Sequence, residues 1–125
     1  MTRANANAPW FLCARDLRAI TEPIIIITVI RSFANHATED LFNGRDTQRA
    51  RSTCPAALWP VLRRKLDLVN KAISLEDLRI PPGNRLERLQ GNRFGQHSIR
   101  VNQQYRVCFT WEDKHAYEVE VTDYH

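Results

Sequence analysis

The chain has 125 residues, a formal net charge of +4 and 43% hydrophobic residues, which suits one small globular domain. Its three cysteines form no CxxC pair, which argues against a disulfide framework or a zinc site and indicates a reducing cytosol. The apolar run at residues 24–30 is shorter than the roughly 20 residues of a membrane span, and no secretory signal pattern surrounds it. We therefore expect a cytoplasmic protein that needs no membrane, metal or cofactor.

The positive charge is concentrated in the middle of the chain. Residues 45–106 hold 13 Lys and Arg against 5 Asp and Glu, whereas residues 107–125 hold 1 Lys against 5 acidic residues. A basic segment of this kind suits a polyanion such as RNA. A solvated helix face has the same composition, so charge alone leaves both interpretations open.

The first predicted elements are a strand and a short helix. Residues 1–28 are expected to form a poorly ordered extension ahead of a domain over residues 29–125. Ile24–Phe33 is rich in β-branched residues and predicts a strand whose upstream half is only loosely attached. The spacing of apolar residues predicts a short helix over Asn35–Asn43, ended by a glycine, and a polar loop or helical turn over Gly44–Thr53.

A long helix is predicted from about Pro55 to Ile73. One apolar stripe runs along it at helical spacing: Leu58, Leu62, Leu66, Val69 and Ile73. Pro60 conflicts with this helix, because a proline in a helix interior costs about 3 kcal/mol. The helix must therefore start near Trp59 or kink there. The Pro-Pro-Gly within Ser74–Asn84 then predicts a loop.

The remaining sequence alternates between apolar and polar residues and predicts an antiparallel meander. The expected strands are Arg85–Gln90, Gln96–Val101, Tyr105–Trp111 and His115–Thr122. This order predicts an α+β fold with helices packed on one face of the sheet. In such a meander, five polar residues can converge on one concave face: Gln90, Asn92, Arg93, Arg106 and His125.

This set contains the residue types that metal-independent RNA cleavage requires. Arginine suits a phosphate whose charge grows during the reaction, since its fork stays charged and matches the phosphate oxygens. Histidine suits proton transfer, because its ordinary pKa is about 6.5. Taken singly, a terminal His125 is more often an exposed tail residue and a strand arginine such as Arg106 is more often solvent-facing or salt-bridged.

The ordered motifs of the chain resemble a known family. Arg85–His125, RLERLQGNRFGQHSIRVNQQYRVCFTWEDKHAYEVEVTDYH, is similar to the C-terminal half of HigB-type toxins in the RelE/ParE superfamily, which approximate L-K-G-D-R-x-G-x-x-S-I-x-x-N-x-x-[WY]-R-[IV]-x-F and end in D-Y-H. The long helix and Pro-Pro-Gly loop within Leu62–Glu87 also match, and Val29–Phe33 resembles the family's usual start. The resemblance therefore runs from about Val29 to His125.

The resemblance implies a RelE-like fold, with two N-terminal helices packed on a mainly antiparallel sheet of four to five strands. It implies a toxin that cuts mRNA in the ribosomal A site, and a HigA-type helix-turn-helix antitoxin as partner. Operator DNA would be bound only by the toxin–antitoxin complex. By the same resemblance, His125 is the acid/base, Arg106 the phosphate clamp and Arg93 a second phosphate contact. Substrate contacts are implied for Tyr124, Asp123, Asn92 and Tyr105.

Two departures affect the implied activity. The family's common Lys is Gln90 here and its Asp is Asn92. A glutamine hydrogen-bonds a phosphate but cannot neutralise it, so we expect the fold and the partner to be kept while cleavage is weakened. Two alternatives stay open: a ParE-like toxin that acts on gyrase, and a weakly catalytic homologue that mainly binds antitoxin and operator. Because family members begin near Val29, we also hypothesise that residues 1–28 stem from an upstream start codon.

Overall fold

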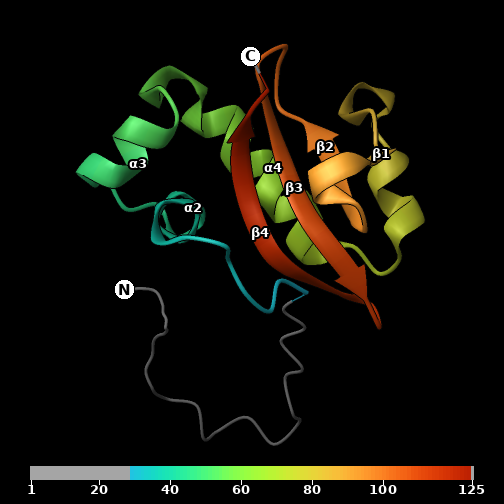
Figure 1. The fold of residues 1–125 in the computed structure, drawn as a ribbon. Coiled ribbons are helices and arrows are strands. Elements are labelled where there is room, and N and C mark those ends of the chain that lie inside the picture. The colour runs from blue at the N-terminus through green and yellow to red at the C-terminus, as the bar shows by residue number, and fades with distance from the viewer. Residues whose placement is uncertain (1–28, 125) are drawn as a thin grey trace, which may run out of the picture.

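The computed structural model describes residues 29–124 and shows an α+β domain (Figure 1). The expectations for residues 1–28 and for the terminal His125 lie outside the described residues. The described elements in chain order are α2 (His36–Asn43), α3 (Gln48–Thr53), η2 (Ala56–Leu58), α4 (Trp59–Lys71), η3 (Leu75–Arg79), η4 (Pro82–Asn84), β1 (Glu87–Arg88), η5 (Gly91–Arg93), β2 (Gln96–Arg100), β3 (Tyr105–Glu112) and β4 (His115–Asp123).

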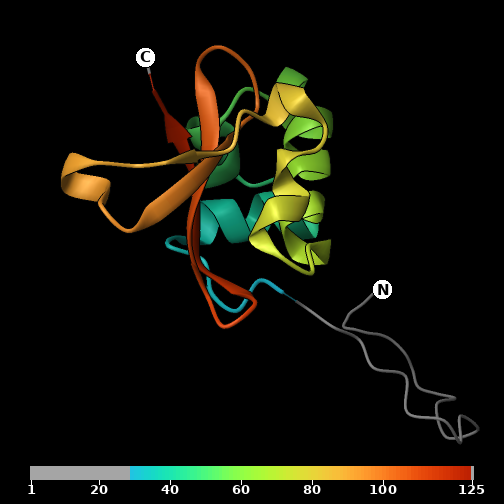
Figure 2. The same cartoon turned by 90° about the vertical axis from the view of Figure 1, so that its right-hand side faces the viewer.

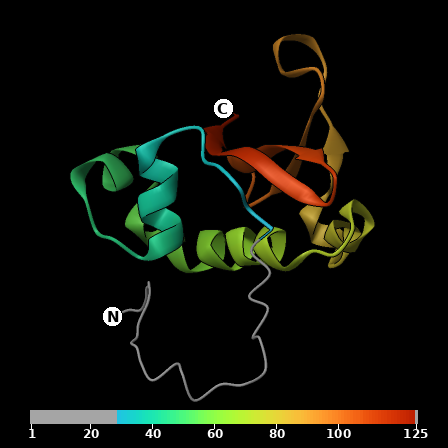
Figure 3. The same cartoon turned by 90° about the horizontal axis from the view of Figure 1, so that it is seen from below.

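The strands form one antiparallel sheet in the order β1-β2-β3-β4, which confirms the predicted meander. In its register, Ile99 lies opposite Val107, and Val107 lies opposite Val121. All three side chains are buried, so one face of the sheet carries the core. Viewed along the sheet, α2 and α4 lie together on one side of it (Figure 3). The α+β class with helices on one sheet face is therefore confirmed.

Helix α4 supplies the helical half of the core. Leu62, Leu66 and Val69, from the predicted stripe, have no exposed surface. Pro60 lies in the first turn, where a proline costs no hydrogen bond, and the helix starts at Trp59 rather than kinking. Ile73 does not continue the stripe and is 76% exposed, so its predicted place in the helix is wrong.

Helix α4 ends before Ile73 because Asp77 hydrogen-bonds the backbone of the residues that follow the helix. The Asp77 carboxylate accepts hydrogen bonds from the backbone N–H groups of Ile73 (2.9 Å) and Ser74 (3.2 Å). Ser74 caps η3, so these residues belong to the start of the next element. The sequence pattern indicated the apolar stripe but not this competing cap.

Two predicted strands are shorter in the structure. Between Val29 and Phe33 there are only isolated parallel bridges to β4, through Ile30 and Phe33. The predicted strand Arg85–Gln90 is reduced to Glu87–Arg88, because Arg85 adopts a left-handed conformation (φ 46°) and Gln90 already caps η5. In the segment predicted as loop or helical turn, Gln48–Thr53 forms a short helix.

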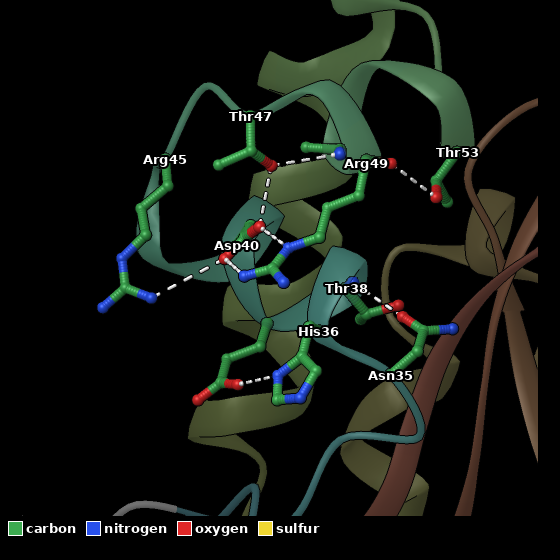
Figure 4. Close-up of polar contacts among 10 residues, drawn as sticks. Asn35, His36, Thr38, Asp40, Arg45, Thr47, Arg49 and Thr53 are labelled. Carbon is green, nitrogen blue, oxygen red and sulfur yellow. Dashed lines mark hydrogen bonds and ion pairs between the residues drawn. The ribbon is translucent and has the colours of Figure 1, made fainter.

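A buried carboxylate fixes the connection between α2 and α3 (Figure 4). Asp40 is 1% exposed and accepts hydrogen bonds from the Thr47 hydroxyl (2.7 Å) and the Arg49 guanidinium, while Arg45 lies 3.6 Å away. The hydrogen bond from Arg49 lowers the pKa of Asp40 to about 2, against the opposing effect of burial. Two arginines of the basic middle of the chain, Arg45 and Arg49, therefore serve to neutralise a buried carboxylate.

Among the described helices, none is long and apolar enough to cross a membrane. Within residues 29–124, no group of three or more His, Cys, Asp or Glu residues is arranged to hold a metal ion.

Candidate functional site

The face of the sheet opposite the helices is polar. Alternation along the strands puts the side chains at every second position on this face, and the register sets them side by side. The segment between β1 and β2 projects outward from the same side, away from the helices (Figure 2). We call this surface the helix-free face; it carries Gln96, Ser98, Arg100, Arg106, Cys108, Thr110 and Glu120.

Arg106 is the most constrained cation of this face. Its Nε donates to the Ser98 hydroxyl at 2.7 Å, and its Nη2 donates to the backbone carbonyl of Arg85 at 2.6 Å. A Glu87 carboxylate oxygen lies 3.8 Å from the same Nη2, and the Arg106 side chain is only 10% exposed. The guanidinium is therefore held in one orientation before any ligand arrives.

Arg106 lines an open hollow of about 520 Å³. Its lining contains three arginines and one carboxylate, so the hollow has a net positive charge: Arg85, Glu87, Arg100, Asn102, Gln103, Arg106 and Tyr124. Arg100 lies opposite Arg106 in the register of β2 and β3, which explains how two cations from neighbouring strands meet there. Part of the basic middle of the sequence thus gathers at one concave site.

Tyr124 borders the hollow at the end of β4. The Arg106 Cζ lies 5.9 Å from the centre of the tyrosine ring, and the hydroxyl lies 3.8 Å from the Cys108 sulfur. Burial and the Cys108 contact raise the pKa of this hydroxyl, while Arg93 and Arg106 act to lower it. Tyr124 remains 44% exposed, so part of its surface is open to a ligand.

Arg93 reaches the same region from the projecting segment. Its Nη1 donates to the side chains of Gln96 (3.0 Å) and Glu120 (3.2 Å). Burial lowers the pKa of Arg93, but the hydrogen bond and charge of Glu120 outweigh it, and the net change is upward. Since Arg93 also acts on the Tyr124 hydroxyl, two arginines and one tyrosine converge.

The structure thus brings together Arg93, Arg106 and Tyr124. Gln90 and Asn92 are exposed on the projecting segment. Asp123 lies at the end of β4 and accepts a hydrogen bond from the Gln104 amide at 3.2 Å.

Tyr105 is not brought to this group, since it lies in the hydrophobic core and is 7% exposed. His125 follows Tyr124 in the chain but lies outside the described residues.

Five residues of the hollow were missed from the sequence: the charged Arg85, Glu87 and Arg100, and the polar Asn102 and Gln103. The alternation of β2 gave a signal for Arg100, because it lies on the face opposite the buried Ile99. Glu87 and Arg85 depend on the register of a two-residue strand, for which the sequence offers no alternation long enough to read.

Comparison with known proteins identifies the family of this chain. Residues 31–125 match the family described as RelE-like toxin of type II toxin-antitoxin system HigB. The chain is 52% identical over 59 residues to Toxin HigB-1 of Vibrio cholerae, covering 47% of this chain and 62% of that protein. It is 44% identical over 62 residues to an uncharacterized protein of Haemophilus influenzae, covering 50% and 61%. The match therefore spans less than two thirds of either relative.

The fold has a solved counterpart as well. A YoeB-YefM complex from Staphylococcus aureus contains a chain with 20% identity and a TM-score of 0.50, covering 77% of this chain and 94% of that one. At this identity the similarity concerns the fold alone.

Proposed function

Because this chain belongs to the HigB family of RelE-like toxins of type II toxin–antitoxin systems, we propose that it is a ribosome-dependent endoribonuclease that cuts mRNA. The carrying observation is the pre-oriented Arg106 in a positively charged hollow, beside Tyr124. A guanidinium fixed before substrate arrives stabilises charge that develops on a phosphate without having to reorganise. Arg93, held by Gln96 and Glu120, supplies a second cation.

The proposed reaction needs no metal. A ribose 2′-hydroxyl loses its proton and its oxygen attacks the adjacent phosphorus. The bond from phosphorus to the 5′-oxygen then breaks, and that oxygen leaves with a proton. In this proposal Glu87, which lines the hollow 3.8 Å from Arg106, accepts the first proton. His125, one residue beyond Tyr124, supplies the proton to the leaving oxygen.

The remaining residues position the substrate. Tyr124 contacts the RNA through its exposed surface, and Asp123 precedes it at the end of β4. Gln90 and Asn92, exposed on the projecting segment, hydrogen-bond the RNA backbone without neutralising it. A substrate contact by Tyr105 would require that β3 be reached from the core side, because this side chain is 7% exposed.

The proposed partners follow from the family. We propose that a HigA-type helix-turn-helix antitoxin binds and silences the toxin, that operator DNA is bound only by that complex, and that the catalytic encounter takes place in the ribosomal A site of a cytoplasmic ribosome. The net charge of +4 favours approach to ribosomal RNA and mRNA, and this attraction will weaken as salt is raised.

The test is primer extension on an mRNA translated by purified ribosomes, with wild-type protein, His125→Ala and Arg106→Ala. Codon-linked cuts that fall by at least about 100-fold in both variants support the mechanism. Arg79→Ala is the matched control, because Arg79 is exposed and paired with Glu76 outside the hollow. Circular dichroism of Arg106→Ala checks that its loss of activity is not a loss of folding.

The same assay separates the alternatives. Gln90→Lys restores the cation that the family pattern carries, and we expect it to raise the cleavage rate. An unchanged rate would show that Gln90 does not limit the reaction. Intact mRNA with blocked gyrase would instead favour a ParE-like toxin. Antitoxin binding without cleavage or gyrase inhibition would favour a pure binding module.

A further inference from the structure

One exposed aromatic side chain of the projecting segment has no role in the reaction proposed above. Phe94 follows Arg93 in the projecting segment and is 77% exposed. It lies on the side of the sheet away from the helices, on a segment that stands out from the domain in two perpendicular views (Figures 2 and 3). The segment that carries Phe94 thus lies on the same side of the sheet as the hollow.

The segment that carries Phe94 forms a turn fixed by its own backbone. Gly91 (φ 65°) and Gly95 (φ 94°) occupy the left-handed region on either side, which a side chain would strain. The Phe94 N–H donates to the Gly91 carbonyl at 3.0 Å, closing a tight turn. Arg93 ties the turn to Gln96 and Glu120. The exposed ring therefore sits on an anchored turn.

The surroundings of Phe94 favour RNA over an apolar protein surface. Its neighbours Gln90 and Asn92 are exposed and polar, and Arg93 is a cation, so the ring stands alone among hydrogen-bonding groups. Tyr124, the other exposed large aromatic among the described residues, also lies within the electrostatic reach of Arg93. Aromatic rings interleaved with cations are the usual platform for unpaired bases.

We infer that Phe94 stacks on an unpaired nucleobase of the RNA bound at the hollow and thereby positions the strand for cleavage. This inference rests on the proposed ribonuclease function for its site, but it concerns binding rather than bond breaking. Arg93 would hold the phosphate next to the stacked base, because it is the residue that joins the turn to the sheet.

The test measures binding to ribosomes programmed with an mRNA whose A-site codon carries 2′-O-methyl groups, which prevents attack by the 2′-oxygen. We expect Phe94→Ala and Phe94→Leu to weaken binding by about tenfold, whereas Phe94→Trp keeps it, since stacking needs a flat ring. Ile80→Ala is the control, because Ile80 is an exposed apolar residue (72%) outside the hollow. The Phe94 variants should fold normally, as the ring packs into no core.

Several results would overturn the inference. The inference is wrong if Phe94→Ala or Phe94→Leu binds the programmed ribosome as tightly as the wild type. It is also wrong if the wild type shows no measurable ribosome binding. A loss of affinity for the antitoxin with unchanged ribosome binding would show that the ring contacts protein instead. Cleavage of unmodified mRNA is measured separately. If the wild type binds ribosomes through Phe94 but does not cleave mRNA, the proposed nuclease activity is refuted and the stacking inference stands. If the wild type cleaves mRNA but its binding does not depend on Phe94, only the stacking inference is refuted.

Discussion

Replacing Asp40 by Asn should destabilise the domain in a pH-dependent way. The carboxylate is 1% exposed, and its pKa falls from 3.8 to about 2, chiefly because Arg49 hydrogen-bonds it. At about 1.4 kcal/mol per pKa unit this shift corresponds to about 2 kcal/mol. Arg49 and Arg45 are 54% and 61% exposed, so water screens them, and we expect about 1–2 kcal/mol at pH 7.

The sign follows from the lowered pKa. The folded state holds the charged form more tightly than the unfolded chain, so the stabilisation is complete above about pH 4 and disappears as the pH falls toward 2. Urea unfolding of wild type and Asp40→Asn between pH 7 and pH 2.5 measures this difference. Asp46→Asn is the control, since that carboxylate is 68% exposed and should change stability by less than about 0.5 kcal/mol. Equal stability of wild type and Asp40→Asn at pH 7, or a difference as large at pH 2.5 as at pH 7, would refute the reasoning.

Three further variants or probes test the core. Leu66→Ala should lower the free energy of unfolding by about 2–5 kcal/mol in urea, whereas Ile73→Ala, at an exposed site, should change it by less than about 0.5 kcal/mol. Asn84→Ala should cost about 1–3 kcal/mol, because two backbone carbonyls lose their buried donor; exposed Asn43→Ala is its control. Cys54 is fully buried, and burial raises its pKa to about 11, so iodoacetamide at pH 8 should label it only in urea; mass spectrometry showing native labelling would contradict this.

The sequence predicted the elements whose apolar spacing reflects a single buried face. Leu62, Leu66 and Val69 follow the period of α4, and Val107 and Ile99 follow the period of their strands, because each faces the same core. The prediction failed at Ile73, where the Asp77 cap competes with the helix, and at Val29–Phe33, where pairing with β4 is interrupted. Such competition depends on tertiary neighbours that a period does not encode.

Some residues of the candidate site could be predicted from the sequence and others could not. Arg106, Arg93 and Tyr124 could be proposed from motifs, since each occupies a recognisable position in an ordered pattern. Glu87 could not, because its place beside Arg106 depends on the register of β1, β2 and β3. For Arg100, the alternation of β2 indicates the face of the sheet but not the pairing with Arg106. Phe94 carried no periodic signal, and only its exposure on the anchored turn singles it out.

The interrupted pairing of Val29–Phe33 has a consequence for the behaviour of the sheet at high concentration. The backbone N–H groups of Arg31 and of Ala34, just after this segment, donate to the carbonyls of Ala116 (2.8 Å) and Val119 (2.9 Å) on the outer side of β4. At the opposite side, β1 is only two residues long, and both are charged. Within residues 29–124, neither edge offers a long run of unpaired backbone groups on which another chain could add a strand. The domain is thus protected against edge-to-edge aggregation without closing into a barrel, and its polar face can stay open.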